Sequence, residues 1–197
     1  MREATGAATR PSIATAALLV LVAVLLLRIA EQTMLRTGLS LDGLEQYAHA
    51  QSWAWGYSLK QPPLYTWLYK LTSLVAPNAL WAEVVLRQVM VLVTTLCIYA
   101  LARGGGLDRQ LSLGAAAGLF LVLDYVYTGQ ATLTHTHACI TALAAALLAL
   151  QRLIQRRSLS SSILFGALCG AAIMSKYLAA VPVLAIVLAT AIHRPTR

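Results

Sequence analysis

The sequence predicts an all-α, polytopic membrane protein with about six transmembrane helices. Of its 197 residues, 59% are apolar and only 11% are charged, whereas soluble domains are about half apolar and a quarter charged. This composition excludes a soluble cytoplasmic enzyme, and the abundance of apolar residues excludes a disordered chain. The net charge of +8 is better explained by cations in loops that set membrane topology than by a nucleic-acid-binding face.

The apolar stretches give the expected spans, each of which needs about 20 apolar residues. Four of them predict one span each: residues 13–30, 81–102, 111–127 and 133–150. No signal-peptide cleavage site follows the first, so we expect it to remain as a helix. The last stretch, residues 163–192, would be about 45 Å long as a single helix, longer than a hydrocarbon core of about 30 Å. Lys176 and its neighbours interrupt it, and the basic clusters before and after it favour a hairpin of two short spans over a single tilted span.

Charge placement orients these spans in a plasma (inner) membrane. Nine of the fifteen Lys and Arg residues fall in every second loop or at the termini: Arg2, Arg10, Arg103, Arg109, Arg152, Arg156, Arg157, Arg194 and Arg197. Because positive loops stay in the cytoplasm, both termini are expected inside. The loop at residues 31–80, the connection at 128–132 and the Lys176 turn are then outside. Residues 1–197 are expected to form a single membrane domain.

The first outside loop, residues 31–80, is expected to carry the functional site. It is much longer than ordinary helix connections, and its Trp and Tyr residues favour helices lying at the membrane interface, with Trp53 and Trp55 as anchors. Ser40 predicts the N-cap of a helix that begins near Leu41.

Three polar residues of that helix share one face, because Asp42, Glu45 and His49 follow i, i+3, i+7 spacing. The alternative is an ordinary solvated face. We favour function, because the loop lies against a membrane, where charges are costly. Further along the loop, Lys60 and Gln61 are held in place by the two prolines that follow them.

Polar groups in the later spans add to this site. Lys176 lies in an apolar stretch, where an ionisable group by default indicates a functional site, although it could also extend to the interface. His135 and His137 are two residues apart on a helix, so they point in different directions and at most one faces the site. Glu83 and Arg87 are four apart and predict a structural ion pair.

A resemblance to the amino-terminal half of the GT-C membrane glycosyltransferases is carried by three stretches of the chain. They are LDGLEQYAHAQSWAWGYSLKQPPLYTWLYKL, LTHTHACITALAAALLAL and GALCGAAIMSKYLAAVPVLAI. The similar enzymes are of the protein-mannosyltransferase and aminoarabinose-transferase type (families 39 and 83), and they use polyprenyl-phosphate sugars on the outer side of the membrane. Because these enzymes are longer, the chain is expected to be a fragment or a truncated relative.

The resemblance implies roles for the polar residues. Asp42 takes the position of the catalytic base, and Lys176 faces the donor phosphate. Substrate binding is assigned to the remaining site residues: Glu45, His49, Tyr57, Lys60, Gln61, His135 and Tyr177.

Three positions depart from the family pattern. Gly43 stands where a second acid is common, and Gln61 where His is frequent. Thr134 and His135 stand near the place of a further acid, which argues against a metal site of the aminoarabinose-transferase kind. No metal ligands are assigned, and the need for a divalent cofactor stays open.

The resemblance and the residues together predict sugar transfer, with inversion, to a hydroxyl group of a glycolipid, polymer or protein. Two alternatives remain open at this stage. Six helices with both ends inside also describe half of a secondary transporter, and the short chain with one acid missing also fits an inactive or scaffold relative.

Overall fold

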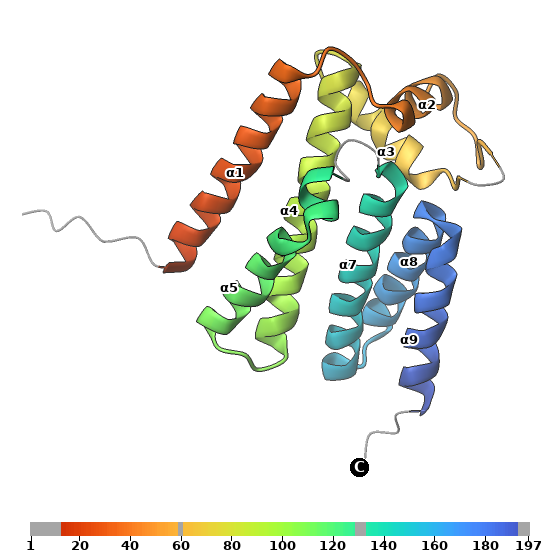
Figure 1. Ribbon diagram of the computed structural model, residues 1–197. Helices are drawn as coiled ribbons and strands as arrows, with labels where there is room; N and C mark the ends of the chain where they lie inside the picture. The colour runs from red at the N-terminus through yellow and green to blue at the C-terminus, as the bar shows by residue number, and fades with distance from the viewer. Residues whose placement is uncertain (1–12, 59–60, 129–132, 193–197) are drawn as a thin grey trace, which may run out of the picture.

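The computed structural model describes residues 13–58, 61–128 and 133–192, and every regular element in these ranges is helical (Figure 1). The all-α prediction is therefore confirmed. The longer helices are α1 (Ile13–Leu35), α2 (Leu41–His49), α3 (Leu64–Ser73), α4 (Ala79–Gly104), α5 (Arg109–Gly118), α7 (Thr134–Arg156), α8 (Leu159–Ser175) and α9 (Ala180–Ile192). Three short helical turns join them: η1 (Leu119–Leu121), η2 (Asp124–Thr128) and η3 (Tyr177–Ala179).

Three of the described helices, α1, α4 and α7, are long and apolar enough to cross a membrane, and α8 and residues 177–192 are shorter apolar helices. The predicted span at 111–127 differs from the structure, because it is not one continuous helix. Helix α5 ends at Gly118, a 3-10 turn follows, and Val122 leaves helical geometry with ψ of 86° before the π-helical turn η2. Glycine is a poor helix former, and α5 contains two of them, Gly114 and Gly118.

The chain reverses direction at Lys176, as the sequence predicted. Helix α8 ends at Ser175, Lys176 has extended backbone geometry (φ −157°, ψ 122°), and α9 follows the short turn η3. Figure 1 shows α8 and α9 side by side and antiparallel. The Lys176 turn therefore lies at one end of the helical bundle.

The short helices α2 and α3 lie at the same end of the bundle as the Lys176 turn (Figure 1). The α4–α5 and α7–α8 connections lie at the opposite end, where the described chain also begins and ends. Arg103, Arg109 and Arg156 belong to these connections. The basic loops thus lie at one end of the bundle and the loop of residues 31–80 lies at the other, as the charge pattern predicts.

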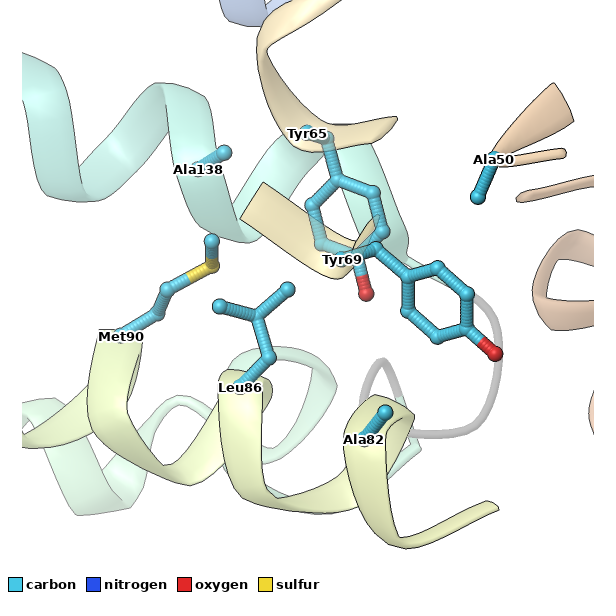
Figure 2. Packing of buried hydrophobic residues seen from close by; sticks show 7 residues of the cluster. All are labelled: Ala50, Tyr65, Tyr69, Ala82, Leu86, Met90 and Ala138. Carbon is cyan, nitrogen blue, oxygen red and sulfur yellow. The ribbon is translucent and has the colours of Figure 1, made fainter. Parts of the chain in front are cut away.

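An apolar cluster fixes α3, and with it the loop of residues 31–80, against the helical bundle. Tyr65 and Tyr69 of α3 are fully or almost fully buried among Leu86 and Met90 of α4 and Ala138 of α7 (Figure 2). The Tyr69 hydroxyl also donates to the Ala79 carbonyl oxygen at 3.2 Å. These contacts place α3 across the start of α4.

Small side chains bring α7 and α8 close together. Ala142 and Ala146 of α7 pack with Cys169 and Ala172 of α8, and all four are buried. Small residues at helix interfaces allow close backbone approach, as is common between membrane helices. The close packing carries the end of α8, and with it Lys176, to the first turn of α7.

Candidate active site

Asp42 lies in the first turn of α2, which begins where the sequence predicted. The Ser40 hydroxyl oxygen accepts a hydrogen bond from the Gly43 amide at 2.9 Å, which is an N-cap contact. The half-buried Asp42 carboxylate lies close to the backbone amide of Thr134, the first residue of α7, which lowers the Asp42 pKa. The start of α2 thus lies next to the start of α7.

The environment of Asp42 favours its neutral form. Burial raises the pKa of Asp42 above its ordinary value of 3.8, and Glu45 adds to the increase, while the Arg87 guanidinium acts in the opposite direction. A carboxylate with a raised pKa is a stronger proton acceptor once it is ionised. The arrangement therefore suits a general base.

Lys176 reaches the same turn of α7 from the other side. Its Nζ donates to the Thr136 hydroxyl oxygen at 3.0 Å. Thr134, whose amide lies close to Asp42, and Thr136 are two residues apart, so they are separated by about 3 Å along the helix axis and point to different sides of it. Asp42 and Lys176 are distant in sequence, yet both contact one helical turn.

A chain of side-chain amides links α2, the proline loop and α7. The Gln61 Nε2 group donates to Glu45 Oε2 at 2.8 Å, and Gln61 Oε1 accepts from Gln46 Nε2 at 2.9 Å. The buried Gln46 also lies 3.1 Å from His135 Nε2, and its Oε1 accepts from the Thr66 hydroxyl at 2.5 Å. Because the Glu45 carboxylate accepts from Gln61 Nε2, Gln61 Oε1 faces Gln46, and the Gln46 amide must donate to it.

Hydrogen bonds fix the position of His135. Its Nδ1 lies 3.1 Å from the Ser175 carbonyl oxygen, which can only accept, so Nδ1 carries a proton. Its Nε2 lies 3.1 Å from Gln46 Nε2 and 3.2 Å from Gln61 Oε1. His135 thus holds the backbone next to Lys176, which connects the amide chain to that turn.

The two histidines point to different surroundings, as their spacing predicts. His135 lies in the amide chain, whereas the fully buried His137 contacts the carbonyl oxygens of Leu133 and Tyr125. Both nitrogens of each ring are thus engaged. The described residues include no group of three His, Cys, Asp or Glu side chains that could hold a metal ion.

The other predicted site residues that the structure describes lie around Asp42, Lys176 and the amide chain, which together form the centre. His49 stacks on Tyr57 with ring centroids 5.1 Å apart, and the Tyr57 hydroxyl donates to the Ser52 carbonyl oxygen at 2.8 Å. Glu45 is exposed, and Tyr177, next to Lys176, is 49% exposed. Lys60 lies outside the described residues.

From the sequence, the Glu83–Arg87 ion pair was expected to have only a structural role, but it belongs to the centre. Glu83 and Arg87 of α4 form the predicted ion pair, with Arg87 Nη2 2.7 Å from Glu83 Oε1, and both are fully buried. The pair lies directly against the start of α2, because the Ser40 hydroxyl donates to Glu83 Oε1 at 2.9 Å. Their i, i+4 spacing predicts the pair but gives no signal of its position.

An aromatic hollow of about 300 Å³ lies beside the centre. It is lined by Trp53, Ala54, Trp55 and Trp67, with Lys70 Nζ 5.0 Å from the centre of the Trp53 ring. Trp67 is fixed by a hydrogen bond from its Nε1 to the Ala54 carbonyl oxygen at 2.9 Å. Trp53 and Trp55 remain 58% and 83% exposed.

Comparison with known proteins places the chain in a family. Residues 60–197 match the family model described as dolichyl-phosphate-mannose-protein mannosyltransferase. The chain belongs to this family. The match includes the stretches with Gln61, His135 and Lys176 and begins after Asp42.

Two curated proteins resemble the chain over most of its length. The lipopolysaccharide core galacturonosyltransferase RgtA of Rhizobium johnstonii is 32% identical over 182 residues, which cover 91% of this chain and 36% of the relative. RgtB of the same organism, with the same described activity, is 29% identical over 139 residues, or 71% of this chain and 28% of the relative. The chain thus spans about a third of the length of these relatives. No solved structure matches it.

Family membership confirms the resemblance that the sequence motifs indicated. It identifies the chain as part of a mannosyltransferase-type membrane glycosyltransferase family. The amide chain and the tryptophan hollow described above lead to two predictions for this mannosyltransferase-family protein.

Replacing Gln46 by leucine is expected to destabilise the fold. The change removes the acceptor of the buried Thr66 hydroxyl and one of the partners of His135 Nε2 and Gln61 Oε1. A buried polar group left without a partner costs about 1–3 kcal/mol. Thermal unfolding in detergent should show a lowered Tm. Gln51→Leu is the control, because Gln51 is exposed and bonds only the nearby Tyr47 carbonyl. Equal Tm values for the two variants would contradict the role of Gln46.

Trp53 and Trp55 are expected to lie in the membrane interface, where amphipathic aromatic rings gather. Lipids brominated near the headgroup should quench tryptophan fluorescence of the protein in nanodiscs, and Trp53→Phe with Trp55→Phe should remove a large part of that quenching. Trp67→Phe, a change in a ring already bonded to the backbone, should leave it largely intact. Unchanged quenching in the double variant would show that the two rings face water.

Proposed function

We propose that the chain forms the catalytic amino-terminal part of an integral membrane glycosyltransferase. The enzyme transfers a sugar from a polyprenyl-phosphate donor to a hydroxyl group of the lipopolysaccharide core on the outer side of the membrane. The observation that carries the proposal is the convergence of Asp42 and Lys176 on the first turn of α7. The names of the two relatives support a hexuronic acid as the sugar and the lipopolysaccharide core as the acceptor.

Asp42 acts as the general base of this reaction. It takes the proton of the acceptor hydroxyl as that oxygen attacks the anomeric carbon of the sugar. A new glycosidic C–O bond forms, and the bond between the anomeric carbon and the donor phosphate oxygen breaks, with its electron pair remaining on the phosphate. Attack from the side opposite to the phosphate inverts the anomeric centre. The raised pKa of Asp42 suits this proton transfer.

Lys176 stabilises the leaving phosphate. Negative charge increases on the phosphate oxygen as the bond to the sugar breaks, and a fixed cation lowers the energy of that state without transferring a proton. The hydrogen bond to Thr136 and the His135 contact to the Ser175 carbonyl hold the ammonium group in place. Lys60 is proposed as a second cation for the same phosphate.

The other polar residues bind substrate around these two groups. Glu45, held by Gln61, is placed to accept hydrogen bonds from sugar or acceptor hydroxyls. His49, stacked on Tyr57, lies one turn further along α2. Tyr177 is exposed next to Lys176 and offers a hydroxyl group and a ring face to the donor.

In the proposed topology this centre lies on the periplasmic, extracytoplasmic side of the membrane. Helices α1, α4, α7, α8 and α9 and the broken segment from α5 to η2 would each cross the membrane, with both termini in the cytoplasm. The proposal is supported by the position of the arginines of the α4–α5 and α7–α8 connections, at the end of the bundle away from α2 and α3 (Figure 1).

The test uses the full-length protein encoded by the reading frame, purified into nanodiscs. Polyprenyl-phosphate galacturonic acid and a lipopolysaccharide core acceptor should yield a core one sugar larger by mass spectrometry. Donors carrying a neutral hexose report on the sugar class. Folded protein that transfers no sugar from any of these donors would contradict the proposal and favour an inactive relative, and solute uptake into liposomes would favour a transporter.

A further inference from the structure

We infer that the buried Glu83–Arg87 pair, packed against Gly43, is a positioning element that sets both the place and the charge environment of Asp42. The inference rests on the proposed function, in which Asp42 is the base. Neither Glu83 nor Arg87 reaches the reacting atoms, because both side chains are fully buried. They act through Asp42.

Glu83 is held rigidly from three directions. Its Oε1 accepts from the Ser40 hydroxyl at 2.9 Å, and it pairs with Arg87 Nη2 at 2.7 Å and Arg36 Nη2 at 3.4 Å. The donors come from the segment after α1, from the cap of α2 and from α4 itself. One carboxylate oxygen therefore ties the start of α2, two residues from Asp42, to the membrane helix α4.

The other oxygen of Glu83 lies where a side chain at position 43 would be. A Cβ atom added to Gly43 would lie 2.2 Å from Glu83 Oε2 and 2.7 Å from Glu83 Cδ, distances that no real contact allows. Oε2 itself is buried and has no hydrogen-bond partner among the described residues. Because Glu83 is held by three donors, it cannot simply move aside. Glycine at position 43 is what lets α2 approach this carboxylate.

The two charges of the pair act on Asp42 in opposite directions. Arg87 favours the ionised form and lowers the Asp42 pKa, whereas Glu83 favours the neutral form and raises it. Glu45 of α2 also raises that pKa, and the Thr134 amide of α7 lowers it. Tyr65 of α3, whose own pKa is raised to about 12, stays neutral. Removing either member of the pair therefore exposes Asp42 to the uncompensated charge of the other.

Stability alone does not account for a buried ion pair at this place. The desolvation cost of two buried charges often equals or exceeds their attraction, so apolar residues of similar size are frequently as stabilising. A pair that contacts the cap of α2 and faces a half-buried carboxylate has a further effect, because it fixes the local charge. The pH dependence of activity separates this effect on the charge of Asp42 from an effect on folding.

The test measures the pH dependence of kcat/KM for the full-length enzyme in nanodiscs, with the Glu83→Gln and Arg87→Gln variants. Loss of the Glu83 charge should move the acidic limb to lower pH, and loss of the Arg87 charge should move it to higher pH, with the larger shift for Arg87. A purely structural role would lower the rate without opposite shifts. Folded variants whose limbs stay in place or move in the same direction would overturn the inference.

A second measurement tests the contact at Gly43 even where a single variant folds poorly. Gly43→Ala should lower kcat at least tenfold, whereas Gly38→Ala, where a Cβ meets nothing within 4 Å, should not. In a Glu83→Ala background, which vacates the space, Gly43→Ala should cost much less, as a double-mutant cycle reveals. Additive effects would overturn the inference. Wild-type turnover in Asp42→Asn would instead overturn the proposed function on which it rests.

Discussion

Replacing Asp42 by asparagine is expected to lower kcat by about 10²–10⁴, the range attributed to general-base catalysis. The amide cannot take the proton of the acceptor hydroxyl. Asparagine has the same size, and its oxygen can still face the Thr134 amide, so the position of α2 and substrate binding should change little. Initial rates of sugar transfer by the full-length enzyme give kcat and KM separately. The loss should fall almost entirely on kcat.

Asp108→Asn is the matched control for this change. Asp108 caps α5, at the opposite end of the bundle, through a bond from the Leu111 amide at 2.8 Å, and asparagine caps helices equally well. Its kcat should equal that of the wild type. A wild-type kcat in the Asp42 variant would remove Asp42 from the mechanism.

The activity of the wild-type enzyme should also fall at acidic pH, as the Asp42 carboxylate becomes protonated. Because only the ionised carboxylate accepts a proton, kcat/KM falls as the pH drops through the pKa of Asp42. Burial raises that pKa above 3.8, so the acidic limb should lie above this value. The pH profile of kcat/KM measures it.

Replacing Lys176 by methionine is expected to lower kcat by about 10²–10³, the cost of removing one fixed group that stabilises developing charge. Methionine has a similar length and no charge, so the chain reversal at Ser175 and η3 should persist. The charge on the departing phosphate would then have no ammonium group beside it. Lys176→Arg, which keeps the charge, should recover part of the rate.

Lys70→Met serves as the comparison, since Lys70 lies over the Trp53 ring on the same side of the protein. Turnover measured at saturating donor and acceptor should be reduced in the Lys176 variant alone. If both methionine variants turn over like the wild type, the phosphate must be stabilised by another group.

Most of the helical framework could be predicted from the sequence, because span length and capping are local properties. Helices α4 and α7 begin near the predicted places, and the Ser40 cap and the reversal at Lys176 were expected from single residues. The break between α5 and η2 was not predicted. Average hydropathy over residues 111–127 reports that a segment is apolar, but it does not report that its backbone leaves helical geometry at Val122.

The centre was predictable only in part, because its partners come from different helices. Helical spacing placed Asp42, Glu45 and His49 on one face, but nothing in that spacing identifies Thr134 and Thr136 as the residues that lie beside Asp42 and Lys176. Those contacts depend on the close packing of α7 with α8.

Three further features of the centre were missed for the same reason. Gln46 has no sequence signal as a buried hub, and the i, i+4 spacing of Glu83 and Arg87 does not show which helix lies across from them. The close approach at Gly43 likewise appears only once α2 is packed against α4.

Cysteine labelling in intact cells tests most directly whether α2 and the Lys176 turn share the outer side of the membrane. Single cysteines replace Leu41 and Tyr177, both well exposed, and Leu107 at the opposite end. The native Cys97, Cys139 and Cys169 are buried. A membrane-impermeant maleimide that reaches the periplasm should label positions 41 and 177 in cells with an intact inner membrane, and position 107 only after that membrane is opened. Labelling of position 177 only after opening would contradict the account, because Lys176 would then face the cytoplasm, away from Asp42.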